Sequence, residues 1–140
     1  MATKRIRLVL DTNWYISATI NKNSRRILYR LLTNKNIAIL YCDEIIAEYQ
    51  QVIIRNKFNK VIKPKQAFRF VDFVLPKLEH IILQTAIAES RDPDDNYLLS
   101  LSIDGNADYL ITGDMDLLVL EQVGTTKIMR LNQFLGSITL

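Results

Sequence analysis

The chain has 140 residues, of which 49% are hydrophobic and 24% charged, so we expect one soluble globular domain over residues 1–140. One cysteine, Cys42, and one histidine, His80, exclude a disulfide framework and a Cys/His zinc site within one chain, so any metal would be held by oxygen. No apolar run is long enough to span a bilayer, and no secretory signal precedes residue 6, so we expect a cytoplasmic protein without membrane contact.

The formal net charge of +3 is unevenly distributed along the chain. Residues 1–70 contain 14 Lys and Arg but 4 Asp and Glu, whereas residues 71–140 contain 4 and 11. An acidic half beside a basic half is expected of a cation-dependent site next to a polyanion-binding surface. Solvated helix faces give the same pattern, and for most of the individual charges that plainer explanation suffices.

Residues 6–10, Ile-Arg-Leu-Val-Leu, predict a strand buried on both faces in the middle of a parallel sheet. The strand ends at Asp11, which places this carboxylate at the sheet edge where open α/β folds bind ligands. A short helix is predicted over residues 14–18. Ser24 is the predicted N-cap of a helix over residues 25–33, with a buried face formed by Ile27, Leu28, Leu31 and Leu32.

Residues 37–41 predict a second strand, and Asp43 is the predicted N-cap of the following helix. Glu48 borders the apolar stripe of this helix, which consists of Ile45, Tyr49, Val52 and Ile53. Pro64 is expected to open another helix and Pro76 to end it, with an apolar stripe of Phe68, Val71, Val74 and Leu75. A short third strand is expected over residues 80–83.

Asp92 as N-cap and Pro93 as first residue predict a helix that ends at Gly105 and Asn106. Fourth and fifth strands are predicted over residues 108–112 and 127–130, and short helical turns over 117–120 and 132–135. Strands that alternate with helices indicate βαβ units and a parallel sheet covered on both sides.

Five acids follow strands or helix starts that this topology can bring to one edge of the sheet: Asp11, Glu48, Asp95, Asp114 and Asp116. Taken singly, each has a structural explanation as a helix cap, a first-turn acid, a half-buried carboxylate or a turn residue. Several carboxylates in one crevice would repel one another unless a divalent cation held them, and carboxylate oxygens suit Mg²⁺ or Mn²⁺. Such ions support the attack of water on a phosphodiester.

The motifs Leu8-Val9-Leu10-Asp11-Thr12-Asn13, Glu48, Asp92-Pro93-Asp94-Asp95-Asn96 and Leu110-Ile111-Thr112-Gly113-Asp114-Met115-Asp116 resemble, in this order, those of the PIN-domain nucleases. The resemblance is closest to the bacterial relatives of the VapC ribonucleases, which are toxin components of toxin–antitoxin systems. It implies a three-layer α/β/α sandwich with a central, mostly parallel five-stranded sheet. It also implies Mg²⁺- or Mn²⁺-dependent cleavage of RNA, a cognate antitoxin and a homodimer.

The resemblance also implies roles for individual residues. Asp11, Glu48, Asp95 and Asp114 match the metal-binding acids, Asp116 matches a supporting catalytic acid, and Asn13 and Thr112 match polar residues that orient them. Asp95 is preferred to Asp94 because Leu98, Leu99 and Ser102 share its helix face. The basic residues expected to contact RNA are Arg25, Arg26, Arg55, Lys57 and Lys60.

Other folds with acids at strand ends fit less well. A phosphoacceptor receiver domain would need an acid pair after the first strand, and a haloacid-dehalogenase-like phosphatase would need Asp where this chain has Asn13. A dinucleotide-binding domain would need a glycine-rich first turn. The remaining alternative is a non-catalytic RNA-binding or protein-interaction module on the same fold, which only a test of turnover separates from a nuclease.

Overall fold

The computed structural model describes residues 4–55, 62–86 and 96–138, in which the strands form one sheet with the order β3-β2-β1-β4-β6-β5. The central strand β1 (Ile6–Leu10) is parallel to β2 (Ile37–Tyr41) on one side and to β4 (Tyr109–Ile111) on the other. The first and fourth predicted strands are therefore neighbours in the sheet.

The outer strands extend this sheet in both directions. β3 (Glu79–His80) is parallel to β2, and β6 (Thr126–Met129) is parallel to β4. A further short strand, β5 (Gln122–Val123), is antiparallel to β6. It was not predicted, because two residues have no detectable periodicity.

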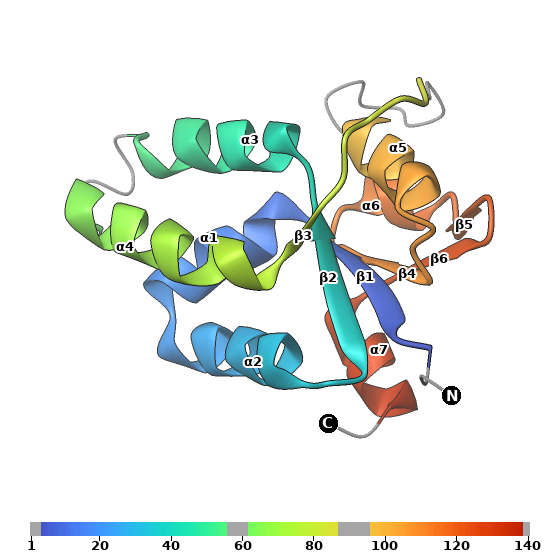
Figure 1. Cartoon of the computed structure of the whole chain (residues 1–140), viewed down its shortest axis with the longest axis horizontal. Helices are drawn as coiled ribbons and strands as arrows, with labels where there is room; N and C mark the ends of the chain where they lie inside the picture. The colour runs from blue at the N-terminus through green and yellow to red at the C-terminus, as the bar shows by residue number, and fades with distance from the viewer. Residues whose placement is uncertain (1–3, 56–61, 87–95, 139–140) are drawn as a thin grey trace.

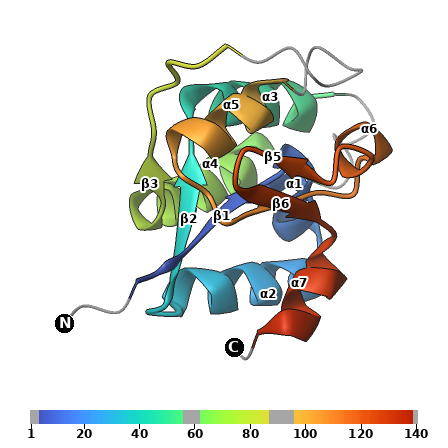
Figure 2. The same ribbon diagram turned by 90° about the vertical axis from the view of Figure 1, so that its right-hand side faces the viewer.

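Helices cover both faces of the sheet, as expected for a three-layer α/β/α sandwich (Figure 1). One side carries α1 (Thr12–Ile20), α2 (Lys22–Thr33), α3 (Asp43–Ile53) and α4 (Pro64–Val74), and α5 (Asn96–Asp104) and α6 (Met115–Leu118) lie on the other. A short 3₁₀ turn, η2 (Leu75–Lys77), follows α4. The last helix, α7 (Leu131–Ser137), lies beside α2 (Figure 2). None of the helices in the described ranges is long and apolar enough to cross a membrane.

The core is densest around β1, where Leu8, Val9 and Leu10 are at most 2% exposed. Because helices cover both faces, neighbouring side chains on this strand are buried in opposite directions, which explains its uninterrupted apolar sequence. Truncation of such a leucine to alanine typically costs about 2–5 kcal/mol. The strand that ends at Asp11 is therefore fixed in the core along its last three residues.

Three helix starts differ from the sequence prediction. The helix α1 begins at residue 12 and not 14, because the Asp11 side chain accepts a hydrogen bond from the Asn13 N–H. The N-cap of α2 is Asn21 and not Ser24, since the Asn21 side chain accepts from two backbone N–H groups. The N-cap of α3 is Cys42, so Asp43 lies inside the helix and is bonded to His80. Asn and Ser cap helices equally well, so the sequence did not discriminate between them.

The prediction of the buried face of α4 was correct for Val74 but wrong for Phe68. Pro64 opens the helix as expected, but the buried residues are Ala67, Phe70 and Val74, whereas Phe68 is 65% exposed. Several aromatic residues permit more than one apolar face here, and the stacking of Phe70 on Tyr49 of α3 selects one of them.

Two boundaries around this region also differ. The third strand comprises only residues 79–80, because the following segment turns away from β2 after one further backbone hydrogen bond, from Ile81 N–H to the Tyr41 carbonyl. The helix α5 ends before Gly105 as predicted, and Asn106 adopts a positive φ of 50°. The expected start at Asp92 and Pro93 lies outside the described residues.

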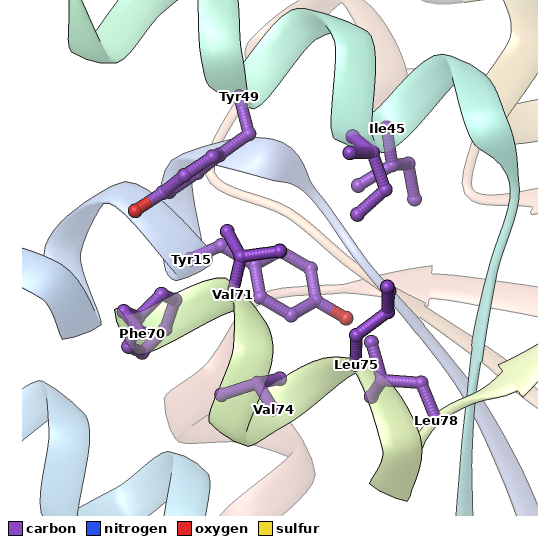
Figure 3. Close-up of a pocket in the computed structure, with 9 residues that line it drawn as sticks. Tyr15, Ile45, Tyr49, Phe70, Val71, Val74, Leu75 and Leu78 are labelled. Carbon is purple, nitrogen blue, oxygen red and sulfur yellow. The ribbon is translucent and has the colours of Figure 1, made fainter. Parts of the chain in front are cut away.

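A small apolar cavity of about 20 Å³ lies between α1, α3 and α4 (Figure 3). The hydroxyl of Tyr15 points into it and, among the described residues, has no hydrogen-bond partner. The cavity is large enough for one water molecule, but a buried water typically needs about three polar partners and the other lining residues shown are mostly apolar. We therefore regard it as a packing defect beneath α1 and not as a ligand site.

Candidate active site

Asp11 is the most buried acid of the site, with 6% of its surface exposed. One carboxylate oxygen accepts from the Asn13 backbone N–H at 3.3 Å, and the other accepts from the Thr112 hydroxyl at 2.7 Å. Burial raises the pKa of Asp11, and the negative charges of Glu48 and Asp114 raise it further, while these two hydrogen bonds oppose the shift. Hydrogen bonds relate Asp11 to the two other acids, through Thr112 to Asp114 and through the adjoining residue Thr12 to Glu48.

Asp114 reaches the site through the turn after β4. The Asp114 N–H donates to the Thr112 hydroxyl oxygen at 3.0 Å, and the Asp114 carboxylate, as N-cap of α6, accepts from the Asp116 N–H at 2.9 Å. Thr112 therefore donates to Asp11 and accepts from Asp114. It joins the ends of the two neighbouring central strands, and its expected role of orienting the metal-binding acids stays a prediction.

Glu48 approaches the same edge from α3 and is half-buried, as its place beside the apolar stripe predicted. Its carboxylate accepts from the Thr12 hydroxyl at 3.1 Å and from the Tyr97 hydroxyl. The Thr12 and Tyr97 hydroxyl oxygens are 2.9 Å apart. Burial raises the pKa of Tyr97 and its hydrogen bond to Glu48 adds to the effect, so the phenol stays a neutral donor.

Thr12 and Tyr97 also belong to the site and were not predicted from the sequence. A signal for both was available, because Thr12 directly follows Asp11, and Tyr97 is two residues after Asp95 in a helix expected to begin at this edge. Both were passed over because a hydroxyl beside a carboxylate has no distinctive spacing. The structure makes them the groups that fix the Glu48 carboxylate.

The remaining predicted site residues are distributed as follows. Asn13 is exposed, and the group it provides to Asp11 is its backbone N–H. Asp116 is half-buried in the first turn of α6. Arg26 and Arg55 are exposed, on α2 and just after α3, while Arg25 is bonded to the end of α1. Asp95, Lys57 and Lys60 lie outside the described residues.

The donor set fits a hard divalent cation, because it consists of carboxylate and hydroxyl oxygens. Within the described ranges, no three Asp, Glu, His or Cys side chains already form a compact cluster of metal ligands. Asp11 and Asp114 face one edge from adjacent strands, and Glu48 is held to Thr12 and Tyr97 beside them. Like charges gathered at a buried carboxylate are the arrangement that a bound cation would relieve.

These features define a parallel α/β domain with an acidic site at the carboxyl edge of its sheet. Residues 7–116 match the model of the PIN domain, and the chain belongs to this family. PIN domains are generally nucleases that use divalent metals. The resemblance on which the sequence analysis relied is thereby confirmed.

Among solved structures, the fold is similar to that of a chain in the crystal structure of VapBC2 from Rickettsia felis bound to a DNA fragment from their promoter. The match has a TM-score of 0.59 and 22% sequence identity, and it covers 88% of this chain and 97% of the other. At this identity the likeness shows the shared fold. No curated protein matches the chain.

Proposed function

We propose that the protein is a divalent-metal-dependent endoribonuclease and the toxin of a toxin–antitoxin pair. The observation that carries the proposal is the buried Asp11 carboxylate, which Thr112 links to the turn of Asp114 and which adjoins Thr12, the hydrogen-bond partner of Glu48. Buried like charges are costly, and proteins retain them where they bind a cation or take part in chemistry.

In this proposal Asp11, Glu48, Asp95 and Asp114 hold Mg²⁺ or Mn²⁺, and Asp116 supports Asp114. The bound cation would polarise the phosphoryl group and activate water for in-line attack. The protein's own contribution is positional. Thr112 fixes Asp11 relative to Asp114, and the Thr12 and Tyr97 hydroxyls keep Glu48 turned toward the same edge.

The proposed partners are an RNA substrate, a cognate antitoxin protein and a second copy of the chain, and the proposed location is the cytoplasm. The PIN family membership supports the nuclease activity, and the likeness in fold to a chain of a VapBC2 assembly supports an antitoxin. A small gene next to this one that encodes a partner able to inhibit cleavage would supply the antitoxin.

The direct test measures RNA cleavage by the purified protein with Mg²⁺ or Mn²⁺. Asp11→Asn and Asp114→Asn should each lower the cleavage rate by about 100-fold or more. Mutating even a hydrogen-bond partner of a metal ligand typically lowers metal affinity or activity by about 10–100-fold. Asp72→Asn, the same change on the exposed side of α4, should retain wild-type activity. Circular dichroism should show that all variants are folded.

Equal cleavage in excess EDTA, or full activity of Asp11→Asn, would reject the metal mechanism. If the folded protein bound RNA but did not cleave it with either metal, the non-catalytic RNA-binding module would be the correct alternative.

A further inference from the structure

A basic surface extends over α2 and α4, at the opposite end of α1 from Asp11. It contains two adjoining hollows of about 400 and 220 Å³, which share Arg25 and Tyr29. No acidic residue lines either hollow, whereas five cations do: Lys22, Arg25, Arg26, Arg30 and Arg69. We call these two hollows together the α2–α4 groove.

The floor of the α2–α4 groove is fixed by hydrogen bonds to the end of α1. Arg25 of α2 donates to the carbonyls of Ala18 and Thr19 at 2.9 and 3.1 Å, and Gln66 of α4 also donates to the Thr19 carbonyl, at 3.3 Å. On the side toward Phe73, the Tyr29 and Phe73 rings connect the two helices, with centroids 5.1 Å apart. The groove is therefore a built feature and not a chance gathering of mobile side chains.

The exposed cations of the groove follow the helical repeat. Lys22, Arg26 and Arg30 are spaced four residues apart and form one stripe along α2, with a rise of about 6 Å between neighbours. The ion pairs found in the described residues join Arg7 to Glu79 and His80 to Asp43, so no acid neutralises this stripe there. A row of separate positive charges suits a chain of repeating anions better than one small anion.

We propose that the α2–α4 groove binds the phosphate backbone of the RNA substrate at a distance from the cleavage site. The inference rests on the proposed function for the identity of the polyanion, and it adds a second contact surface to it. The nine-residue helix α1, roughly 13 Å long, separates the groove from Asp11, so an RNA that uses both must extend along the protein. Phosphate contacts of this kind position a substrate without reading its sequence.

The test measures binding of a labelled RNA hairpin by fluorescence anisotropy in EDTA, where no metal-dependent cleavage occurs. Arg26→Glu/Arg30→Glu should weaken binding about tenfold or more at low salt and reduce the slope of log Kd against log salt by about 1.5–2. Lys4→Glu/Lys127→Glu changes the net charge equally at exposed positions outside the groove and should stay within about twofold of wild type.

Because Arg30→Glu places a negative charge in the last turn of α2, where it can destabilise the helix, Arg26→Gln/Arg30→Gln serves as a milder variant. It removes the same two cations and should reduce the slope by about 1.5. Binding by the folded groove variants that equals that of the control would overturn the proposal. The proposal would also be overturned if the groove variants lost more affinity for a DNA hairpin of the same sequence than for the RNA. Loss of poly-glutamate binding with RNA binding unaltered would likewise assign the groove to another partner.

The two proposals fail separately. If the protein cleaves no RNA with Mg²⁺ or Mn²⁺ but the groove variants lose RNA binding, the proposed nuclease activity is refuted and the proposed RNA-binding groove stands. If the protein cleaves RNA with metal and the groove variants bind RNA as well as the control variant does, only the proposed RNA-binding role of the groove is refuted.

Discussion

The two ends of α1 present opposite chemistry. At its N-terminus, Asp11 caps the helix while Glu48 and Asp114 add further negative charge. At its C-terminus, Arg25 and Gln66 donate to the last carbonyls. Both arrangements agree with the helix macrodipole, which favours negative charge at the start of a helix and positive charge at its end.

The difference between the ends lies in what satisfies the charges. The guanidinium of Arg25 has protein carbonyls as partners, so the C-terminal end is complete in the protein alone. The acids at the N-terminal end are held near each other by hydroxyl and N–H donors, but these donors do not cancel their mutual repulsion. The first end therefore carries the negative charge that the proposed cation would offset, and the second serves as a scaffold for the α2–α4 groove.

The largest effect should come from adding a cation at the acidic end. Because burial and the neighbouring acids raise the pKa of Asp11, its ionised form at neutral pH lowers stability, and a bound cation should offset this cost. At a Mn²⁺ concentration 100 times its Kd, the free energy of unfolding should rise by about 2.7 kcal/mol. Asp11→Asn should lose this increase, while Asp72→Asn should keep it. Chemical denaturation with and without Mn²⁺ measures the effect, and an equal increase in Asp11→Asn would contradict it.

The hydrogen bonds at the C-terminal end of α1 can be tested by mutation, without any ligand. Arg25→Ala removes two charge-assisted hydrogen bonds to the last turn of α1, so we expect a loss of about 2 kcal/mol in the free energy of unfolding. Arg26→Ala, on the next residue of the same helix, removes an exposed cation and should cost less than about 0.5 kcal/mol. Urea denaturation compares the two. Equal losses would mean that Arg25 does not act as a structural cap.

The same contrast explains what the sequence predicted well. The strands β1, β2 and β4 were found because their apolar runs are buried on both faces, and the acids at their ends follow from parallel topology. The pairing of β1 with β4 places Asp11 beside Thr112, and the Thr112 hydroxyl accepts from the Asp114 N–H. Here the apolar runs, their length and the alternation with helices all indicate the same fold.

The errors arise where several local solutions have similar energies. Asn21 and Ser24 cap helices equally well, and Phe68 and Phe70 are equally apolar, so packing partners elsewhere in the chain made the choice. The RNA contact expected of Arg25 stays a prediction, but its hydrogen bonds to Ala18 and Thr19 could not be foreseen, because they depend on the turn between two helices. The contact of Tyr97 with Glu48 joins α5 to α3 and is likewise invisible locally.

The smallest predicted effect concerns this contact. Tyr97→Phe keeps the ring but removes the hydroxyl that donates to Glu48, so the carboxylate should lose one of the two groups that orient it. We expect Mn²⁺ affinity, measured by calorimetry, to fall by about tenfold, the lower range for partners of metal ligands. Tyr109→Phe, whose ring packs on Phe134 away from the acids, should leave the affinity unchanged. Equal Mn²⁺ affinity in both variants would mean that Thr12 alone fixes Glu48, and the acidic end of α1 would then be organised without any contribution from α5.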